Sequence, residues 1–209
     1  MFKPAVLSAA ALALSLALPL SAMAQNNQNN PLSPNAAASG NSQTNLSSQD
    51  KQFMDQAAQA NASEIRAALV AEDKAQNPTV KDFGRLMIFD HTELGADMTA
   101  LADRLGVTLP VGPGQQANQQ MDQLEKQQGA SFDSAYMHAQ VEDHEKAIAL
   151  FQKEAKSSSN EVSNLAKIAL PILEQHLALA RLIDSSLSGQ QAQASQRAKP
   201  AAGGSNARP

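Results

Sequence analysis

The stretch VKDFGRLMIFDHTELGADMTALADRL, residues 80–105, decides the fold. Its apolar residues recur every three or four positions and so form one stripe along a helix: Val80, Phe83, Met87, Leu94, Met98, Leu101 and Leu105. His91 falls on the same stripe, between Met87 and Leu94. The helical geometry that buries the apolar side chains therefore directs an imidazole ring into the core.

Three further segments repeat this helical pattern. Asn77 and Pro78 both stop one helix and start the next, and Gly106 suits the left-handed turn after a helix end. Pro171 lies inside the last helix and predicts a kink there. The pattern predicts an all-α, antiparallel four-helix bundle with a short extra helix in the central crossover. The expected helices cover residues 47–76, 78–105, 131–156 and 161–187, and the short one covers 116–128.

Each of the other long helices also carries one ionisable residue in its apolar stripe: Glu64 between Ala60 and Ala67, His144 between Val141 and Ile148, and His176 between Ile172 and Leu179. These residues and His91 lie roughly 12 to 16 residues from their helix starts, or about 18 to 24 Å along the axis. In an antiparallel bundle such midpoints coincide. We therefore expect the four groups in one central layer, walled by Met87, Met98, Met137, Ile148, Ile172 and Leu179.

A buried layer of three imidazoles and one carboxylate needs partners, because a buried polar group without one costs about 2 to 7 kcal/mol. The residue types suit one transition-metal ion, either Fe, Mn, Zn or Cu, held by Glu64, His91, His144 and His176. The alternative is a metal-free hydrogen-bonded network that locks helix register or senses pH. Asp90 and Asp143 precede two of the histidines but point about 100° away, which is typical of solvated surface charges.

Composition restricts the partners and the chemistry. The net charge is −4, and Lys and Arg form no cluster, so nucleic acid and anionic membranes are excluded as main partners. The 209 residues contain no Cys, no glycine-rich phosphate loop and no Gly-x-Ser-x-Gly motif. Whether the protein is an enzyme stays open, as does a partner in the cell envelope or a second copy of the chain.

The two ends of the chain differ from the middle. Residues 1–24 have a basic start at Lys3, an apolar run and an Ala-Met-Ala cleavage site, which predicts an export signal and a periplasmic or secreted protein without stable membrane insertion after cleavage. Residues 25–46 predict a disordered linker and residues 188–209 a disordered tail, because both are rich in Gln, Asn, Ser and Ala. The helical domain is expected over residues 47–187.

Several motifs follow one another in a recognisable order: Asp90-His91, Phe132-Asp-x-x-Tyr136, His144-Glu-Lys-Ala147 and Leu170-Pro-x-Leu-Glu-x-His-Leu177. Over residues 49–185 the chain closely resembles the bacterial secreted proteins grouped as domain of unknown function 4142. The resemblance implies an exported, ferritin-like four-helix bundle without an established activity. For an exported protein with a histidine and glutamate layer, our hypothesis is a role in envelope stress or metal handling. It also implies that Glu64, His91, His144 and His176 are family motif positions, together with Asp133 and Tyr136.

The comparison with ferritin has a chemical limit. Di-iron bundles place a Glu three residues before the ligating His on two helices. Here Ile88, Val141 and Leu173 occupy those positions, so a ferroxidase centre is not expected. Asp133 is predicted to cap a helix, and Tyr136 to be a half-buried ring.

Overall fold

The computed structural model describes residues 46–157 and 160–198, and this part of the chain is all-helical. The predicted export signal, residues 25–45 of the predicted linker and residues 199–209 lie outside the described residues. No described helix is both long enough and apolar enough to cross a membrane. The helices are α1 (Ser48–Lys74), α2 (Pro78–Leu105), α3 (Gln115–Leu124), α4 (Gly129–Ala155) and α5 (Glu161–Ala198).

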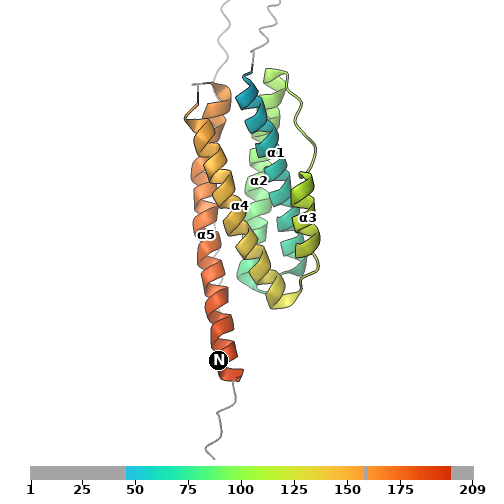
Figure 1. The fold of residues 1–209 in the computed structure, drawn as a ribbon, viewed down its shortest axis with the longest axis vertical. Coiled ribbons are helices and arrows are strands. Elements are labelled where there is room, and N and C mark those ends of the chain that lie inside the picture. Colours follow the sequence, from blue (N-terminus) through green and yellow to red (C-terminus); the bar gives the residue numbers. More distant parts are fainter. Residues whose placement is uncertain (1–45, 158–159, 199–209) are drawn as a thin grey trace, which may run out of the picture. The chain divides into compact units, whose positions relative to one another are not determined.

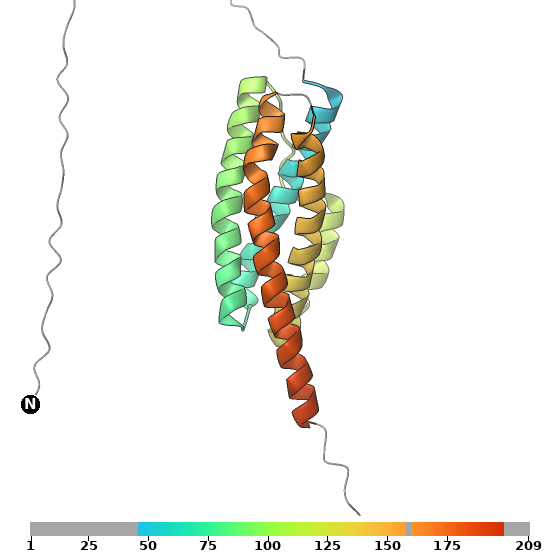
Figure 2. The ribbon, with the colours of Figure 1, turned by 90° about the vertical axis from the view of Figure 1, so that its left-hand side faces the viewer.

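The four long helices lie side by side (Figures 1 and 2). α1 packs against α2 and α4, while α5 packs against α4 and α2, so each long helix has two long neighbours. Neighbouring helices run in opposite directions. The short helix α3 lies in the crossover between α2 and α4 and packs against both α1 and α4. This arrangement brings the middles of α1, α2 and α4 to a common level beside the N-terminal half of α5, which extends past the other helices.

The helix ends follow from local chemistry. The Ser47 side chain accepts a hydrogen bond from the Asp50 backbone N–H at 3.0 Å, which caps α1. Asn77 caps α2 in the same way, and Pro78 occupies the first turn. α2 ends at Gly106, whose φ of 67° is the left-handed conformation predicted for it. The described backbone continues as helix through Pro171.

The α5 helix extends past its predicted end at Leu187 and continues to Ala198. No structure was expected in residues 188–198, because they have no apolar stripe. They are rich in Gln and Ala, which favour helix, and residues 191–197 are exposed. A helix already formed is extended at little cost by such residues.

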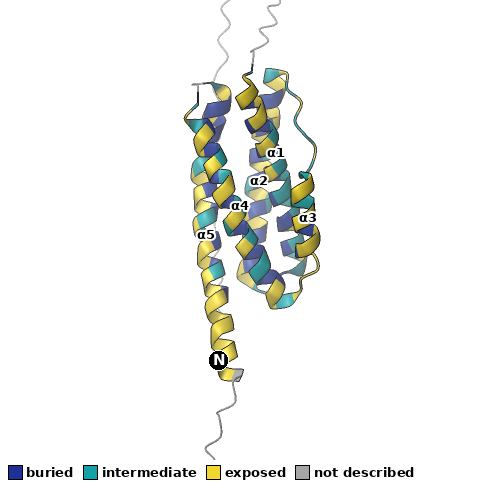
Figure 3. Cartoon of the chain, in the orientation of Figure 1, coloured by how far each residue is buried: buried dark blue, intermediate teal, exposed yellow. Residues whose placement is uncertain are grey.

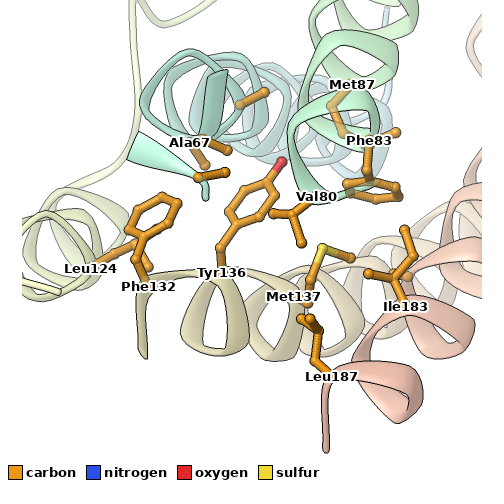
Figure 4. Packing of buried hydrophobic residues seen from close by; sticks show 14 of the residues in the cluster. Ala67, Val80, Phe83, Met87, Leu124, Phe132, Tyr136, Met137, Ile183 and Leu187 are labelled. Carbon is orange, nitrogen blue, oxygen red and sulfur yellow. The ribbon is translucent and has the colours of Figure 1, made fainter. Parts of the chain in front are cut away.

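The buried side chains form one stripe on each helix (Figure 3) and gather into two apolar clusters. The first contains Phe83, Met87, Tyr136, Met137 and Ala180, among others (Figure 4). The second lies on the other side of the helix midpoints: it includes Phe53, Leu94, Ile148, Phe151 and Leu173. In α2, α4 and α5 a histidine separates the residues of one cluster from those of the other.

Two residues assigned to the core from the sequence are exposed. Ile172 retains 37% of its accessible surface, and the buried position beside it belongs to Leu173. Ala60 of α1 is also exposed, and Asn61 is buried in its place. Leu179 is only partly buried. The rest of the predicted stripe is buried in both helices, so these differences concern single positions, each about 100° around the axis from its buried neighbour.

The sequence suggested that Asp133 caps its own helix. It does not, because α4 begins earlier, at Gly129. Its carboxylate instead accepts hydrogen bonds from the backbone N–H groups of Gln76 at 3.1 Å and Asn77 at 2.8 Å. These two residues form the turn between α1 and α2. Asp133, itself 3% exposed, thus joins α4 to that turn.

We expect Asp133→Ala to lower the free energy of unfolding by about 2 kcal/mol, because two backbone donors lose a charged acceptor. Urea unfolding of the purified protein measures the change. Asp122→Ala, at an exposed position of α3, serves as the control and should cost less than about 0.5 kcal/mol. Equal stability of the two variants would show that the carboxylate does not hold the turn.

Candidate metal centre

Three of the predicted site residues come together between the two apolar clusters. His91 of α2, His144 of α4 and His176 of α5 are 3%, 1% and 1% exposed. Their ring centroids are 5.4 to 5.8 Å apart. One ring nitrogen of each lies within 4.8 Å of one from each of the others, so the three residues could hold a metal ion.

The orientation of His91 is set by Asn61 of α1. The Asn61 amide N–H donates to the backbone carbonyl of His91 at 2.9 Å, which fixes which end of the amide carries oxygen. The amide oxygen then lies 2.9 Å from His91 Nδ1. Since that oxygen can only accept, Nδ1 must carry the proton.

The other two rings are held by acceptors in the same manner. His144 Nδ1 lies 2.9 Å from the backbone carbonyl oxygen of Gln140, and His176 Nε2 lies 2.8 Å from a carboxylate oxygen of Asp90. Each of these nitrogens therefore donates its proton outward. Hydrogen bonds of this kind are typical behind metal-bound histidines, whose ring orientation they fix.

The remaining nitrogen of each ring is buried and has no hydrogen-bond partner: His91 Nε2, His144 Nε2 and His176 Nδ1. In a neutral imidazole whose other nitrogen carries the proton, this nitrogen presents a lone pair. The three histidines thus offer three acceptors and no donor to the space between them. A cation satisfies such a set, whereas another acceptor does not.

Electrostatics keep these rings neutral. Burial, reinforced by the other two histidines, lowers the pKa of His91 to about 3. Burial likewise lowers the pKa of His144 to about 4, with His176 adding to the effect. The pKa of His176 is also lowered by burial, against an opposing hydrogen bond from its ring to Asp90. At neutral pH all three rings are in the form that binds metals.

Glu64, the fourth predicted ligand, is not part of the group that the three histidines form. It is buried at a nearby position of α1, where it accepts a hydrogen bond from Gln140 Nε2 at 2.7 Å. Burial raises its pKa to about 8, and the hydrogen bond from Gln140 opposes that shift. The carboxyl group therefore faces α4 beside the histidines.

Three polar residues around the site were not identified correctly from the sequence. Asn61 and Gln140 were overlooked, although each lies on a buried stripe: Asn61 follows Ala57 by four residues and Gln140 precedes His144 by four. Asp90 was expected to be a solvated charge, but its carboxylate contacts His176 across the α2–α5 contact. Asp143, expected to behave similarly, does contact a lysine at the surface, Lys146 at 2.9 Å.

Tyr136 is wholly buried, not half-buried as expected. It extends from α4 into the first apolar cluster and stacks on Phe132, with ring centroids 6.0 Å apart (Figure 4). Its hydroxyl group is buried without a hydrogen-bond partner. The ring therefore serves as a core residue, and burial, with a smaller effect from Glu64, raises the pKa of the Tyr136 hydroxyl group.

A cavity of about 410 Å³ opens beside the histidines. His91 and His144 line its inner end, and Glu64 lies on its wall. The rest of the lining comes mainly from α1, from α4 and from the first part of α3, with Leu94 of α2 and Leu173 of α5 added. The cavity thus borders His91 and His144, whose Nε2 atoms are themselves buried.

Over the residues that the structure describes, the fold is all-helical and its core contains a cluster of three histidines that could hold a metal ion. The chain belongs to the family described as "Domain of unknown function (DUF4142)", whose family model matches residues 35–183. This confirms the resemblance noted in the sequence. No curated protein and no solved structure matches the chain.

Proposed function

We propose that this protein is an exported, ferritin-like four-helix bundle that binds a single transition-metal ion through His91, His144 and His176. One observation carries the proposal: each ring has one nitrogen donating outward, while the other is buried without a partner. Three buried acceptors without a donor would cost several kcal/mol in an empty core. A bound cation removes that cost.

The donor set restricts the ion. Neutral imidazoles suit Zn, Cu, Fe and Mn in their divalent states, and three protein ligands leave a coordination position for water or another ligand. Among the described residues the histidine group includes no carboxylate, so the site does not fit two irons. We assign Glu64 a place next to the ion rather than on it, because its carboxyl is held by Gln140.

The setting proposed for this activity is the cell envelope. Residues 1–24 have the features of an export signal, and the residues that follow contain no Cys that could mispair in an oxidising compartment. Handling of a transition metal, or of reactive oxygen during envelope stress, fits such a location. An envelope protein or a second copy of the chain is the proposed partner class, and nucleic acid is not.

Elemental analysis of the exported protein, purified without chelator, tests the proposal. We expect about one equivalent of a transition metal per chain, or uptake of one equivalent when the purified protein is offered Zn²⁺ or Mn²⁺. Protein that neither contains nor takes up metal would overturn it. The three histidines would then serve to fix the register of the helices. The hydrogen bond between Asn61 and His91 joins α1 to α2, and the one between Asp90 and His176 joins α2 to α5.

Replacing Asp90 by Asn is expected to weaken metal binding by about 10- to 100-fold, because the charged acceptor behind His176 is lost. A competitive titration with a coloured chelator measures the affinity. Asp143→Asn is the matched control: this residue also precedes a histidine, but it pairs with Lys146 and should change the affinity less than about threefold. Equal losses in both variants would point to net charge rather than to the contact with His176.

A further inference from the structure

The cavity beside the histidines has the dimensions of a ligand site. Its volume of about 410 Å³ lies at the lower end of the range for pockets that bind small molecules, about 300 to 1,000 Å³. It reaches His91 and His144. A metal ion held by the histidines would therefore lie next to the cavity.

The sequence of α1 explains why this space exists. The other three long helices each bring a histidine to the central layer, whereas α1 lines the cavity with Ala57, Ala60 and Glu64, among others. Alanine side chains leave room that a larger residue would fill. The helix that contributes no histidine is thus the helix beside the cavity.

The charges around the cavity favour a negatively charged ligand once a metal ion is bound. Three neutral imidazoles leave the charge of a divalent ion uncompensated. The acidic residues of the lining do not repel an anion strongly: Asp143 is paired with Lys146 at 2.9 Å, and burial raises the pKa of Glu64 to about 8. An anion that enters the cavity is therefore attracted by the metal ion and is repelled only weakly by the acidic residues of the lining.

The inner wall is apolar. Leu94, Leu150, Phe151 and Leu173 line the cavity next to the two histidines. They come from three different helices, so the surface is curved around the cavity rather than confined to one side. An apolar group placed against them is removed from water, which strengthens its binding by about fourfold for each methylene.

We propose that the cavity admits a small monoanion with a short apolar tail, such as a short-chain carboxylate, to the open coordination position of a metal ion at His91, His144 and His176. This inference rests on the metal binding proposed above. The anionic head binds the ion, and the tail lies against the leucines and Phe151. The volume of the cavity limits the length of the tail.

Co²⁺-loaded protein tests the proposal, because the visible absorption of Co²⁺ reports a change of its ligands. Azide probes the head group alone, whereas acetate and butyrate share a carboxylate but differ by two methylenes. We expect all three anions to change the spectrum. Butyrate should bind about 15-fold more tightly than acetate, since its two additional methylenes are buried.

Ala147 of α4 lines the cavity, so Ala147→Leu fills part of it without altering a histidine. This variant should lose the preference for butyrate over acetate while azide binds within about threefold of the parent protein. Ala149→Leu is the matched control, at an exposed position of the same helix outside the cavity lining, and should keep the preference. Ala60→Leu places a leucine on the opposite wall and gives the same test if the first variant folds poorly.

The outcomes separate the two proposals. Failure of the parent protein to take up Co²⁺ or any other transition metal would overturn the metal centre itself. Uptake of Co²⁺ without a response to azide, acetate or butyrate would leave the metal centre standing and overturn the ligand site. A butyrate preference that survives both cavity-filling variants would show that the anion reaches the metal by another route, which also overturns the inference.

Discussion

Replacing His144 by Ala is expected to reduce the affinity for a transition metal by more than about 100-fold and to leave the purified protein essentially free of metal. Structural metal sites are worth about 10 to 16 kcal/mol with four ligands, so one ligand accounts for several kcal/mol. His144 is 1% exposed and its Nε2 has no other partner, so no water or neighbouring side chain takes over its role. Elemental analysis and a Zn²⁺ titration measure the loss.

The chain offers a matched control for this experiment. His138 lies on the same helix, but its side chain is 68% exposed and contacts Glu142 at 3.3 Å. His138→Ala should retain the full metal content. His144→Gln keeps most of the side-chain volume and separates loss of a ligand from a cavity in the core. If the His144 variants fold and bind metal as well as the His138 variant, the three-histidine centre is wrong.

The histidine layer was predictable because it depends on two regularities of a helix. A side chain three or four residues from two apolar neighbours shares their face, and 1.5 Å of rise per residue gives its depth. Both hold for His91, His144 and His176, which the structure brings together. Helix ends were predictable where a single residue sets them, as Asn77 and Gly106 do.

The hydrogen-bond partners of the histidines depend on which helices are neighbours, and the helical pattern of the sequence does not predict this. Asp90 points about 100° away from His91, and this direction is towards α5 because α2 and α5 are neighbours. Seen from the sequence alone, the same direction looks like solvent. Asp143 stands in the same relation to His144, yet it reaches Lys146 at the surface.

Glu64 shows the same limit for a residue at the right depth. It lies on the buried stripe of α1, but its carboxyl accepts a hydrogen bond from Gln140, and Asn61 of the same helix is the residue that contacts His91. Ile172 and Leu173 show the same limit in α5, where an exposed and a buried apolar residue are neighbours in the sequence. The helical pattern therefore predicted the layer but not which oxygen or nitrogen faces the histidines.

The metal-free protein is expected to be most stable just below pH 7 and to lose stability on both sides. The histidines cause the acid loss. Their ordinary pKa is near 6.5, but the folded state holds the pKa of His91 at about 3 and that of His144 at about 4. Below pH 6.5 the unfolded chain therefore binds protons that the folded chain does not, and folding becomes less favourable as the pH falls.

Glu64 acts in the opposite direction. Its folded-state pKa of about 8 lies above its ordinary value of 4.5, so between these values the folded chain holds a proton that the unfolded chain has released. Between pH 4.5 and 6.5, the proton held by Glu64 in the folded chain offsets the proton that one histidine binds in the unfolded chain. From about pH 7 to 8, where the histidines no longer titrate, Glu64 makes the stability fall as the pH rises. With His176 also shifted downward, the net difference near pH 5.5 is one to two protons, or about 1.4 to 2.8 kcal/mol per pH unit.

Urea unfolding of chelator-treated protein from pH 4.5 to 8.5 measures this curve. Glu64→Gln keeps an acceptor for Gln140 and removes the titrating group, so it should abolish the decline above pH 7 and steepen the acid side by about 1.4 kcal/mol per pH unit. His138→Ala should leave the curve unchanged, because that ring is exposed. A stability of Glu64→Gln that stays constant between pH 4.5 and 6.5 would mean that the buried rings take up protons in the folded state, because this variant lacks the opposing titration of Glu64. The neutral histidine layer on which the metal centre depends would then not exist.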